Sequence, residues 1–262
     1  ALHDFDLRHA LAMLPRSPLF WLVFVGFYLT APASEWFIYR RLWNIPPSCL
    51  AALLRKLVCN ELLLGYLGEA YLYTWARRRV NMAAAPFGAI KDVAVLSAIA
   101  GNGVTLASLA LIWPFVGNTQ LGLESRPVIW SLGFVLATSI VVMLLRGRIF
   151  TLDRRELWFI MRVHLLLIGA VTALTALLWH LVLPEVPVTW WMLLATMRML
   201  ISRLPLVPNK DVVFAGLAAF TLGHETQIAA LMTMMASLIL LTHVLVGGGL
   251  VLTDLMRKGE DE

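Results

Sequence analysis

Long uncharged runs of apolar residues recur along the chain and alternate with short clusters of arginine. Because a helix that crosses a bilayer needs about 20 mostly apolar residues, each run of that length predicts a membrane span. The first run is long enough once the charged residue that follows it is placed at the membrane interface. The five predicted spans are Pro18–Ser34, Val93–Leu123, Pro127–Leu145, Val163–Pro184 and Ile228–Thr253.

The composition supports the same conclusion. The 262 residues are 60% hydrophobic and 14% charged, and the mean hydropathy is +0.80. A soluble domain carries about 25% charged residues, so this chain has too few to cover a surface that faces water. The sequence therefore predicts an all-α integral membrane protein that forms a single membrane domain over residues 1–262.

The basic residues set the orientation of the spans. The net charge of +5 comes from clusters at the ends of the apolar runs, and such clusters are typical of the cytoplasmic side. We therefore expect a cytoplasmic tail at 253–262, an interfacial segment at 1–17 and a periplasmic N-terminus. Because no folded basic domain accompanies these residues, nucleic-acid binding is not expected. The clusters are Arg40–Arg41, Arg77–Arg79, Arg146–Arg155 and Arg257–Lys258.

Two segments must return to the side from which they start. By this orientation Asn44–Ala76 begins and ends on the cytoplasmic side, and Glu185–Gln227 begins and ends on the outer side. Each is apolar enough to enter the membrane, so we predict two oppositely oriented re-entrant helical hairpins. The alternative is two helices lying flat on opposite leaflets. Flat helices have a strongly polar face, which these segments lack.

The two hairpin regions share an order of features, and we interpret residues 44–116 and 185–252 as an inverted repeat. Each has a short helix with basic residues, a break, a second short helix and then a long span. Interrupted apolar segments in matching positions of two halves indicate a transporter-like binding site. Since irregular backbone at membrane depth must face protein or a water-filled cavity, the two breaks should meet at a cavity.

Ionisable residues in these regions are the candidates for function, because each costs about 2.5–3.5 kcal/mol to insert. An arginine fork binds phosphate bidentately, and a lipid phosphate is the anion that a bilayer offers. We expect the anionic headgroup to bind Arg198, Arg203, Lys210 and Arg55. The expected cavity and gating residues are Gly65, Gly68, Glu69, Lys91, Asp92, Pro205, Pro208, Asp211 and Glu225.

Simpler roles exist for some of these residues. Arg55 and Lys56 could extend to the headgroups at the membrane surface, and Lys91 with Asp92 could form a pair that binds no ligand. No nucleophile motif, phosphate-binding glycine loop or cluster of metal ligands is present. We therefore expect no cofactor, no metal and no enzymatic activity. An intramembrane enzyme would need an acid–base pair, for which His224 beside Glu225 is the candidate.

Three short motifs resemble a known family. Asn60–Tyr71 (NELLLGYLGEAY) resembles the glycine–glutamate hairpin in the flippase-like membrane region of lysylphosphatidylglycerol synthetases and their uncharacterised relatives. Ala89–Val93 (AIKDV) is similar to that family's basic-x-Asp element, and Ser202–Pro208 (SRLPLVP) to its second hairpin. The order of these elements agrees over roughly residues 18–252.

The resemblance implies that four residues occupy the family's hairpin positions. These are Glu69, Asp92, Arg203 and Pro208. The family's glycine-rich turn is replaced here by Asn209–Asp211, which adds two charges. The synthetase domain is absent from this sequence, so transfer of an aminoacyl group to lipid is not implied.

The sequence thus leads to two hypotheses. The first is a flippase of the bacterial inner membrane that moves an anionic lipid or lipid-linked intermediate through a polar cavity between the hairpins. The second is a non-transporting membrane subunit that scaffolds or regulates a partner, such as an envelope-biosynthesis enzyme. Membrane lipids are the expected partners in the first case, and another protein or a second copy of the chain in the second.

Overall fold

The computed structural model describes residues 15–63, 67–79, 86–116, 150–203 and 225–260, together with Gly133, Ala137 and Phe214. These parts contain helices and no strand, which confirms the predicted all-α class. The helices are α2 (Pro18–Trp43), the short 3-10 helix η1 (Pro47–Cys49), α3 (Leu50–Leu62), α4 (Leu67–Arg79), α5 (Pro86–Val116), α8 (Arg154–Val182), α9 (Val188–Arg203) and α11 (Glu225–Glu260).

Four of these helices are long and apolar enough to cross a membrane. The qualifying stretches are Pro18–Trp43, Pro86–Ser108, Arg154–Val182 and Ala230–Met256. They confirm four of the predicted spans, and the predicted span Pro127–Leu145 lies outside the described residues except for Gly133 and Ala137. The helices extend beyond the uncharged runs. The 29 residues of α8, for example, reach about 44 Å, against about 30 Å of hydrocarbon.

The segment predicted to form the first hairpin contains two short helices, α3 and α4, among its described residues. Asn44 ends α2 in the left-handed conformation, with φ 50°, and its N–H donates to the Arg40 carbonyl at 2.8 Å. This reverses the chain, and α3 and α4 then pack against each other in antiparallel order. Entry of the hairpin into the membrane remains a prediction.

The break between α3 and α4 differs in detail from the prediction. Gly65 lies outside the described residues, whereas Gly68 lies inside α4. A side chain at Gly68 would collide with the Lys56 carbonyl oxygen and with Asn60. Gly68 therefore permits close packing of the two helices instead of interrupting them.

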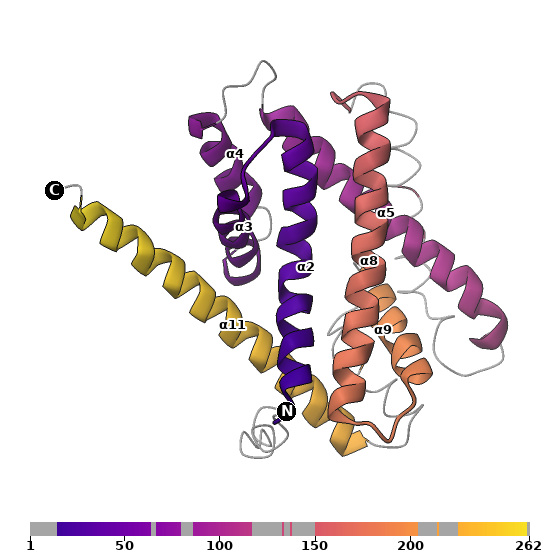
Figure 1. Ribbon diagram of the computed structural model, residues 1–262. Coiled ribbons are helices and arrows are strands. Elements are labelled where there is room, and N and C mark those ends of the chain that lie inside the picture. The colour runs from indigo at the N-terminus through magenta and orange to yellow at the C-terminus, as the bar shows by residue number, and fades with distance from the viewer. Residues whose placement is uncertain are drawn as a thin grey trace.

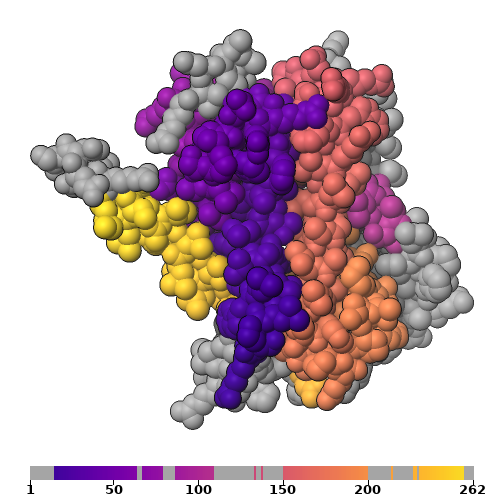
Figure 2. All heavy atoms as spheres, viewed as in Figure 1, coloured from indigo at the N-terminus to yellow at the C-terminus, as the bar shows by residue number. Residues whose placement is uncertain are grey.

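The remaining helices form a bundle around α2 and α8. These two helices lie side by side and antiparallel (Figure 1), and α9 folds back along α8 after the turn that follows Val182. Behind them, α5 packs on α8 and α9. The 36-residue α11 crosses the bundle obliquely, and its C-terminal half extends beside the hairpin (Figure 2).

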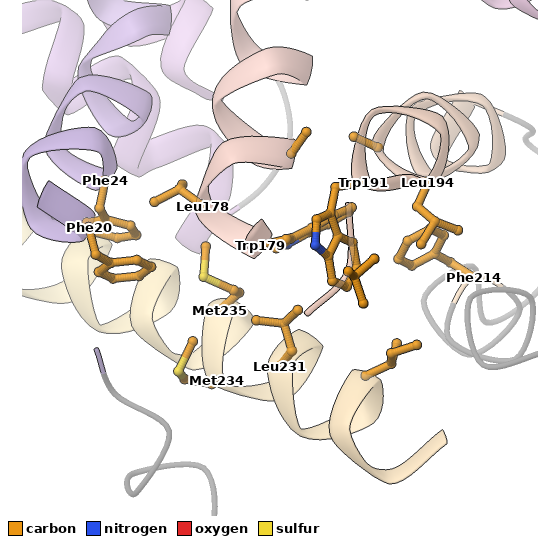
Figure 3. Packing of buried hydrophobic residues seen from close by; sticks show 14 residues of the cluster. Phe20, Phe24, Leu178, Trp179, Trp191, Leu194, Phe214, Leu231, Met234 and Met235 are labelled. Atoms are coloured by element: carbon orange, nitrogen blue, oxygen red, sulfur yellow. The ribbon is translucent and has the colours of Figure 1, made fainter. Parts of the chain in front are cut away.

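Apolar side chains form two clusters, one at each end of the bundle. The first cluster, shown in Figure 3, joins the beginning of α2, the end of α8, α9 and the beginning of α11 around Trp179, whose ring centroid lies 5.6 Å from that of Trp191 and 5.7 Å from that of Phe214. The second joins the end of α2, α3, α4 and the beginnings of α5 and α8. Its buried members are Ile38, Tyr39, Ile45, Leu53, Leu72, Ile90, Val93, Leu96 and Ile160.

Candidate functional site

A cavity of about 290 Å³ lies between α2, α5, α8 and α9, at the level between the two apolar clusters. One face of α8 forms much of its wall, because residues 164, 167, 168, 171, 172 and 175 recur at helical spacing. Polar groups come from Ser97 on α5, from His164, Thr172 and Thr175 on α8, and from Arg198 on α9. In the rest of the wall the side chains are apolar.

The cavity lies near the middle of the spans. Its α8 residues run from His164 to Thr175, and the midpoint of that range is close to the middle of Arg154–Val182. The residue from α2 is Ala31, halfway along Pro18–Trp43. An aqueous or polar space at this level is where an ionisable side chain inside a membrane is expected to point.

Arg198 is the predicted headgroup ligand that the structure places at this cavity. It lies ten residues after Val188, the first residue of α9, and so about 15 Å along that helix. That is about half the thickness of the hydrocarbon core. The side chain is exposed at the cavity wall.

The other predicted residues of the second hairpin lie at or beyond the limits of the described structure. Arg203 is the last residue of α9, and Glu225 is the first of α11. Lys210, Asp211, Pro205 and Pro208 fall outside the described residues.

A buried ion cluster ties the first hairpin to α2. Lys56 is 6% exposed, and its ammonium donates a hydrogen bond to Glu35 and lies 3.3 Å from the Glu69 carboxylate. Two carboxylates thus surround one ammonium, each from a different helix. Because a buried charge without a partner costs several kcal/mol, this cluster fixes α2, α3 and α4 together.

Asn60 completes the contact between the helices of the hairpin. Its side-chain oxygen accepts the Gly68 N–H at 2.7 Å, and its amide nitrogen donates to Glu69 at 3.3 Å. Glu69 therefore lies on the predicted hairpin, where its contacts hold the hairpin closed. The buried Glu69 Oε2 and the Tyr39 hydroxyl have no hydrogen-bond partner among the described residues.

Arg55, the neighbour of Lys56 on α3, contacts α11. Its guanidinium donates to Asp254 at 2.7 Å and to the Leu250 carbonyl at 3.1 Å. A third donor approaches the Tyr71 hydroxyl at 3.5 Å. Arg55 thus connects α11 to the hairpin, and its predicted part in headgroup binding remains a prediction.

Asp92 holds the segment that leads into α8. The carboxylate is fully buried, and its Oδ2 accepts from the Thr151 N–H at 2.7 Å, the Thr151 hydroxyl at 2.9 Å and the Leu152 N–H at 2.8 Å. Lys91 lies 3.4 Å from Oδ1. The predicted pair therefore forms, and Asp92 connects the beginnings of α5 and α8.

Several residues of these sites escaped the sequence analysis. Glu35 appeared to be an interfacial residue, and contact with the headgroups was the simpler role considered for Lys56. The signal that could have paired them is that they carry opposite charges and each lies beside an apolar run. The 3.0 Å contact between the Tyr28 hydroxyl and His243 Nδ1 joins α2 to α11 across 215 positions, and no sequence spacing indicates it.

The chain was compared with protein-family models, with curated proteins and with solved structures, and none of them matches it.

Proposed function

We propose that the chain moves an anionic lipid between the two leaflets, with the headgroup passing through the cavity beside Arg198. The observation that carries the proposal is a cationic side chain about 15 Å along α9, at the wall of a cavity midway along the spans. An ionisable group at that depth is costly and is usually retained for a function. A lipid phosphate is the anion to which a guanidinium at this level has access.

The lining of the cavity suits a headgroup. Arg198 can bind a phosphate bidentately, while Ser97 and Thr175 supply hydroxyl groups that can replace its water. His164 adds a ring nitrogen at the other end of the same face. These groups offer a charged headgroup polar contacts that hydrocarbon does not.

The size of the cavity indicates how much of the lipid it takes. A volume of about 290 Å³ is at the lower end of the range for sites that enclose a small molecule, about 300–1,000 Å³. It accommodates a headgroup and leaves no room for two acyl chains. The chains therefore stay in the bilayer while the headgroup crosses.

The ion cluster of Lys56, Glu35 and Glu69 holds the α2 wall of the cavity in place. Glu35 lies one helical turn beyond Ala31, which is the α2 residue at the cavity. Lys56 holds Glu35 in place, so α2 forms a fixed wall. Movement that alternates access would then involve α9, on the opposite wall. The resemblance of residues 60–71 to a flippase-like region agrees with the proposal.

The test is transport in liposomes. Purified wild type and Arg198→Gln are reconstituted with a fluorescent phosphatidylglycerol, and dithionite quenching reports its movement to the outer leaflet. We expect Arg198→Gln to slow this movement about tenfold or more, because hydrogen bonds to charged groups contribute about 1.5–3 kcal/mol. Arg78→Gln, which removes an exposed charge at the end of α4, is the matched control. Equal rates for wild type, Arg198→Gln and protein-free liposomes overturn the proposal.

A non-transporting subunit is the second candidate, and α11 favours it. In the most apolar stretch of α11, 11% of the residues are buried. Leu245 and Leu252 in this helix are each more than half exposed. Such a face can contact lipid or a partner helix. If this candidate is correct, the purified protein forms a complex of fixed stoichiometry, and Leu245→Trp disrupts that complex. The liposome assay then shows no lipid movement that depends on the protein.

A further inference from the structure

A second basic hollow lies where α2 ends and α8 begins, away from the Arg198 cavity. Its volume is about 520 Å³, and its wall consists of Arg41, Arg155, Trp158, Phe159 and Arg162. The four α8 residues recur at i, i+3, i+4 and i+7, so they share one helix face. Arg162 and His164 are two positions apart and point to roughly opposite sides of α8, which separates this hollow from the cavity.

The hollow has a surplus of positive charge. The Arg41 guanidinium is held by Glu156 through two hydrogen bonds of 2.7 and 2.9 Å, and it lies 4.3 Å from the centre of the Phe159 ring. Arg41 is therefore neutralised and fixed. Among the residues that the structure describes, no carboxylate forms an ion pair with Arg155 or Arg162. Two guanidinium groups remain to bind an anion.

The length of α8 places these arginines at the level of the lipid phosphates. After Arg162 the helix continues to Val182 without another residue of Asp, Glu, Lys or Arg. Those roughly 20 residues cover about 30 Å, the thickness of the hydrocarbon core. Arg162 therefore lies at the edge of the hydrocarbon, and Arg155 lies about 10 Å farther out, in the headgroup layer.

The side chains around the two arginines are also those expected at the boundary between the headgroup layer and the hydrocarbon core. Trp158, between the two arginines, is 59% exposed, as an aromatic residue at a membrane interface usually is. One turn deeper on α8 than Arg162, Leu166 is 73% exposed. The basic hollow thus opens directly onto an apolar surface suited to an acyl chain.

We infer that the hollow between Arg155 and Arg162 binds the phosphate of a resident anionic phospholipid, with its acyl chain along Leu166. The two guanidinium forks hold the phosphate from either side of Trp158, which covers the glycerol region. This site anchors a lipid from one leaflet, and it does not require that the chain move lipid. The lipid would bind to this site equally well if the protein did not transport lipid.

The test measures retained lipid and not transport. The protein is purified from membranes, placed in nanodiscs of phosphatidylcholine with one tenth phosphatidylglycerol, and its bound lipid is counted by native mass spectrometry. We expect the double variant Arg155→Gln/Arg162→Gln to lose about tenfold or more of the preference for the anionic lipid. The double variant Arg77→Gln/Arg78→Gln removes the same charge from the end of α4 and should retain the preference.

A second measurement locates the lipid. Phosphatidylglycerol brominated in its acyl chain should quench the fluorescence of Trp158 more strongly than brominated phosphatidylcholine does, as judged by the difference from Trp158→Phe. Equal quenching by the two lipids, or equal lipid retention by the wild type and the Arg155/Arg162 variant, overturns the inference. It is also overturned if inorganic phosphate in detergent displaces the lipid at millimolar concentration, because the site would then recognise free phosphate.

Discussion

Lys56 on α3 and Glu69 on α4 face each other across the hairpin, with the ammonium nitrogen 3.3 Å from the carboxylate. The same ammonium donates to Glu35 on α2. One side chain therefore joins three helices, and its charge is neutralised by one carboxylate from α2 and one from α4.

Removal of the Lys56 charge should strongly destabilise the protein. Lys56→Met leaves Glu35 and Glu69 as two carboxylates without a buried counter-charge, and breaking a buried ion pair in this way costs about 3–5 kcal/mol. Thermal unfolding in detergent should show a clear fall in melting temperature. The triple variant Glu35→Gln/Lys56→Met/Glu69→Gln should recover most of the loss, since no charge is then left buried. A Lys56→Met protein that melts with the wild type contradicts this account.

A methyl group at Gly68 should force the hairpin apart. Its Cβ would collide with the Lys56 backbone carbonyl, which cannot rotate away as a side chain can. We expect Gly68→Ala to cost about 1–3 kcal/mol through overpacking. Gly248→Ala is the control, because nothing lies within 4 Å of its added methyl group and alanine favours a helix over glycine. The measurement is the melting temperature, and equal values for the two variants refute the close packing.

Neutralisation of Asp92 should loosen the segment before α8. Asp92→Asn keeps the shape of the side chain, but a neutral acceptor binds the three donors of Thr151 and Leu152 more weakly. We expect a loss of about 1–3 kcal/mol, together with faster hydrogen exchange at the amides of these two residues. Lys91→Gln should have a smaller effect, because its ammonium is partly exposed and lies 3.4 Å from Asp92 Oδ1. Unchanged exchange at both amides in Asp92→Asn speaks against this role.

The link between Arg55 and Asp254 should be measurable but weak. The two side chains are 26% and 51% exposed, so solvent screens much of their attraction. A double-mutant cycle of Arg55→Ala and Asp254→Ala should give a coupling free energy of about 0.2–1 kcal/mol. The readout is the free energy of unfolding in mild denaturant. A coupling of zero would mean that Arg55 is held by its contacts with the Leu250 carbonyl and the Tyr71 hydroxyl and not by Asp254.

The two ends of α8 should lie on opposite sides of the membrane. In a background with Cys49 and Cys59 replaced by serine, single cysteines are introduced at Asp153 and Glu185, both of which are exposed. A membrane-impermeant maleimide added to one side of sealed vesicles should label one of these positions and not the other, because 29 residues of α8 separate them. Labelling of both positions from the same side rules out α8 as a span.

Hydropathy was sufficient to find α2, α5, α8 and α11, since a span is defined by its length and its lack of charge. It underestimated their lengths, because Arg154 and Glu156 belong to α8 even though they are charged. Helix ends in the interface tolerate charge, so an uncharged run marks only the hydrocarbon part of the helix.

Contacts between helices were harder to predict. The antiparallel order of α3 and α4 followed from orientation, but the pairing of Lys56 with Glu35 depends on how α2 lies against the hairpin. The role of Gly68 was misjudged because a glycine that ends a helix and one that lets two helices approach look alike in a sequence. Of the predicted headgroup residues, Arg198 lies at the wall of the cavity, and its binding of a headgroup stays a prediction.

The two contacts that fix α11 bridge the greatest distances along the chain. Arg55 and Asp254 are 199 positions apart, and Tyr28 and His243 are 215 apart. The partners of Lys56, by contrast, are all present once residue 69 has been synthesised. Since a chain emerges from its N-terminus, the hairpin and α2 can neutralise the buried Lys56 early, whereas Arg55 meets its carboxylate partner only after α11 has been synthesised. The sequence separation of the ion pairs therefore indicates an order of assembly. Lys56 pairs with nearby residues first, and Arg55 pairs with the distant Asp254 last.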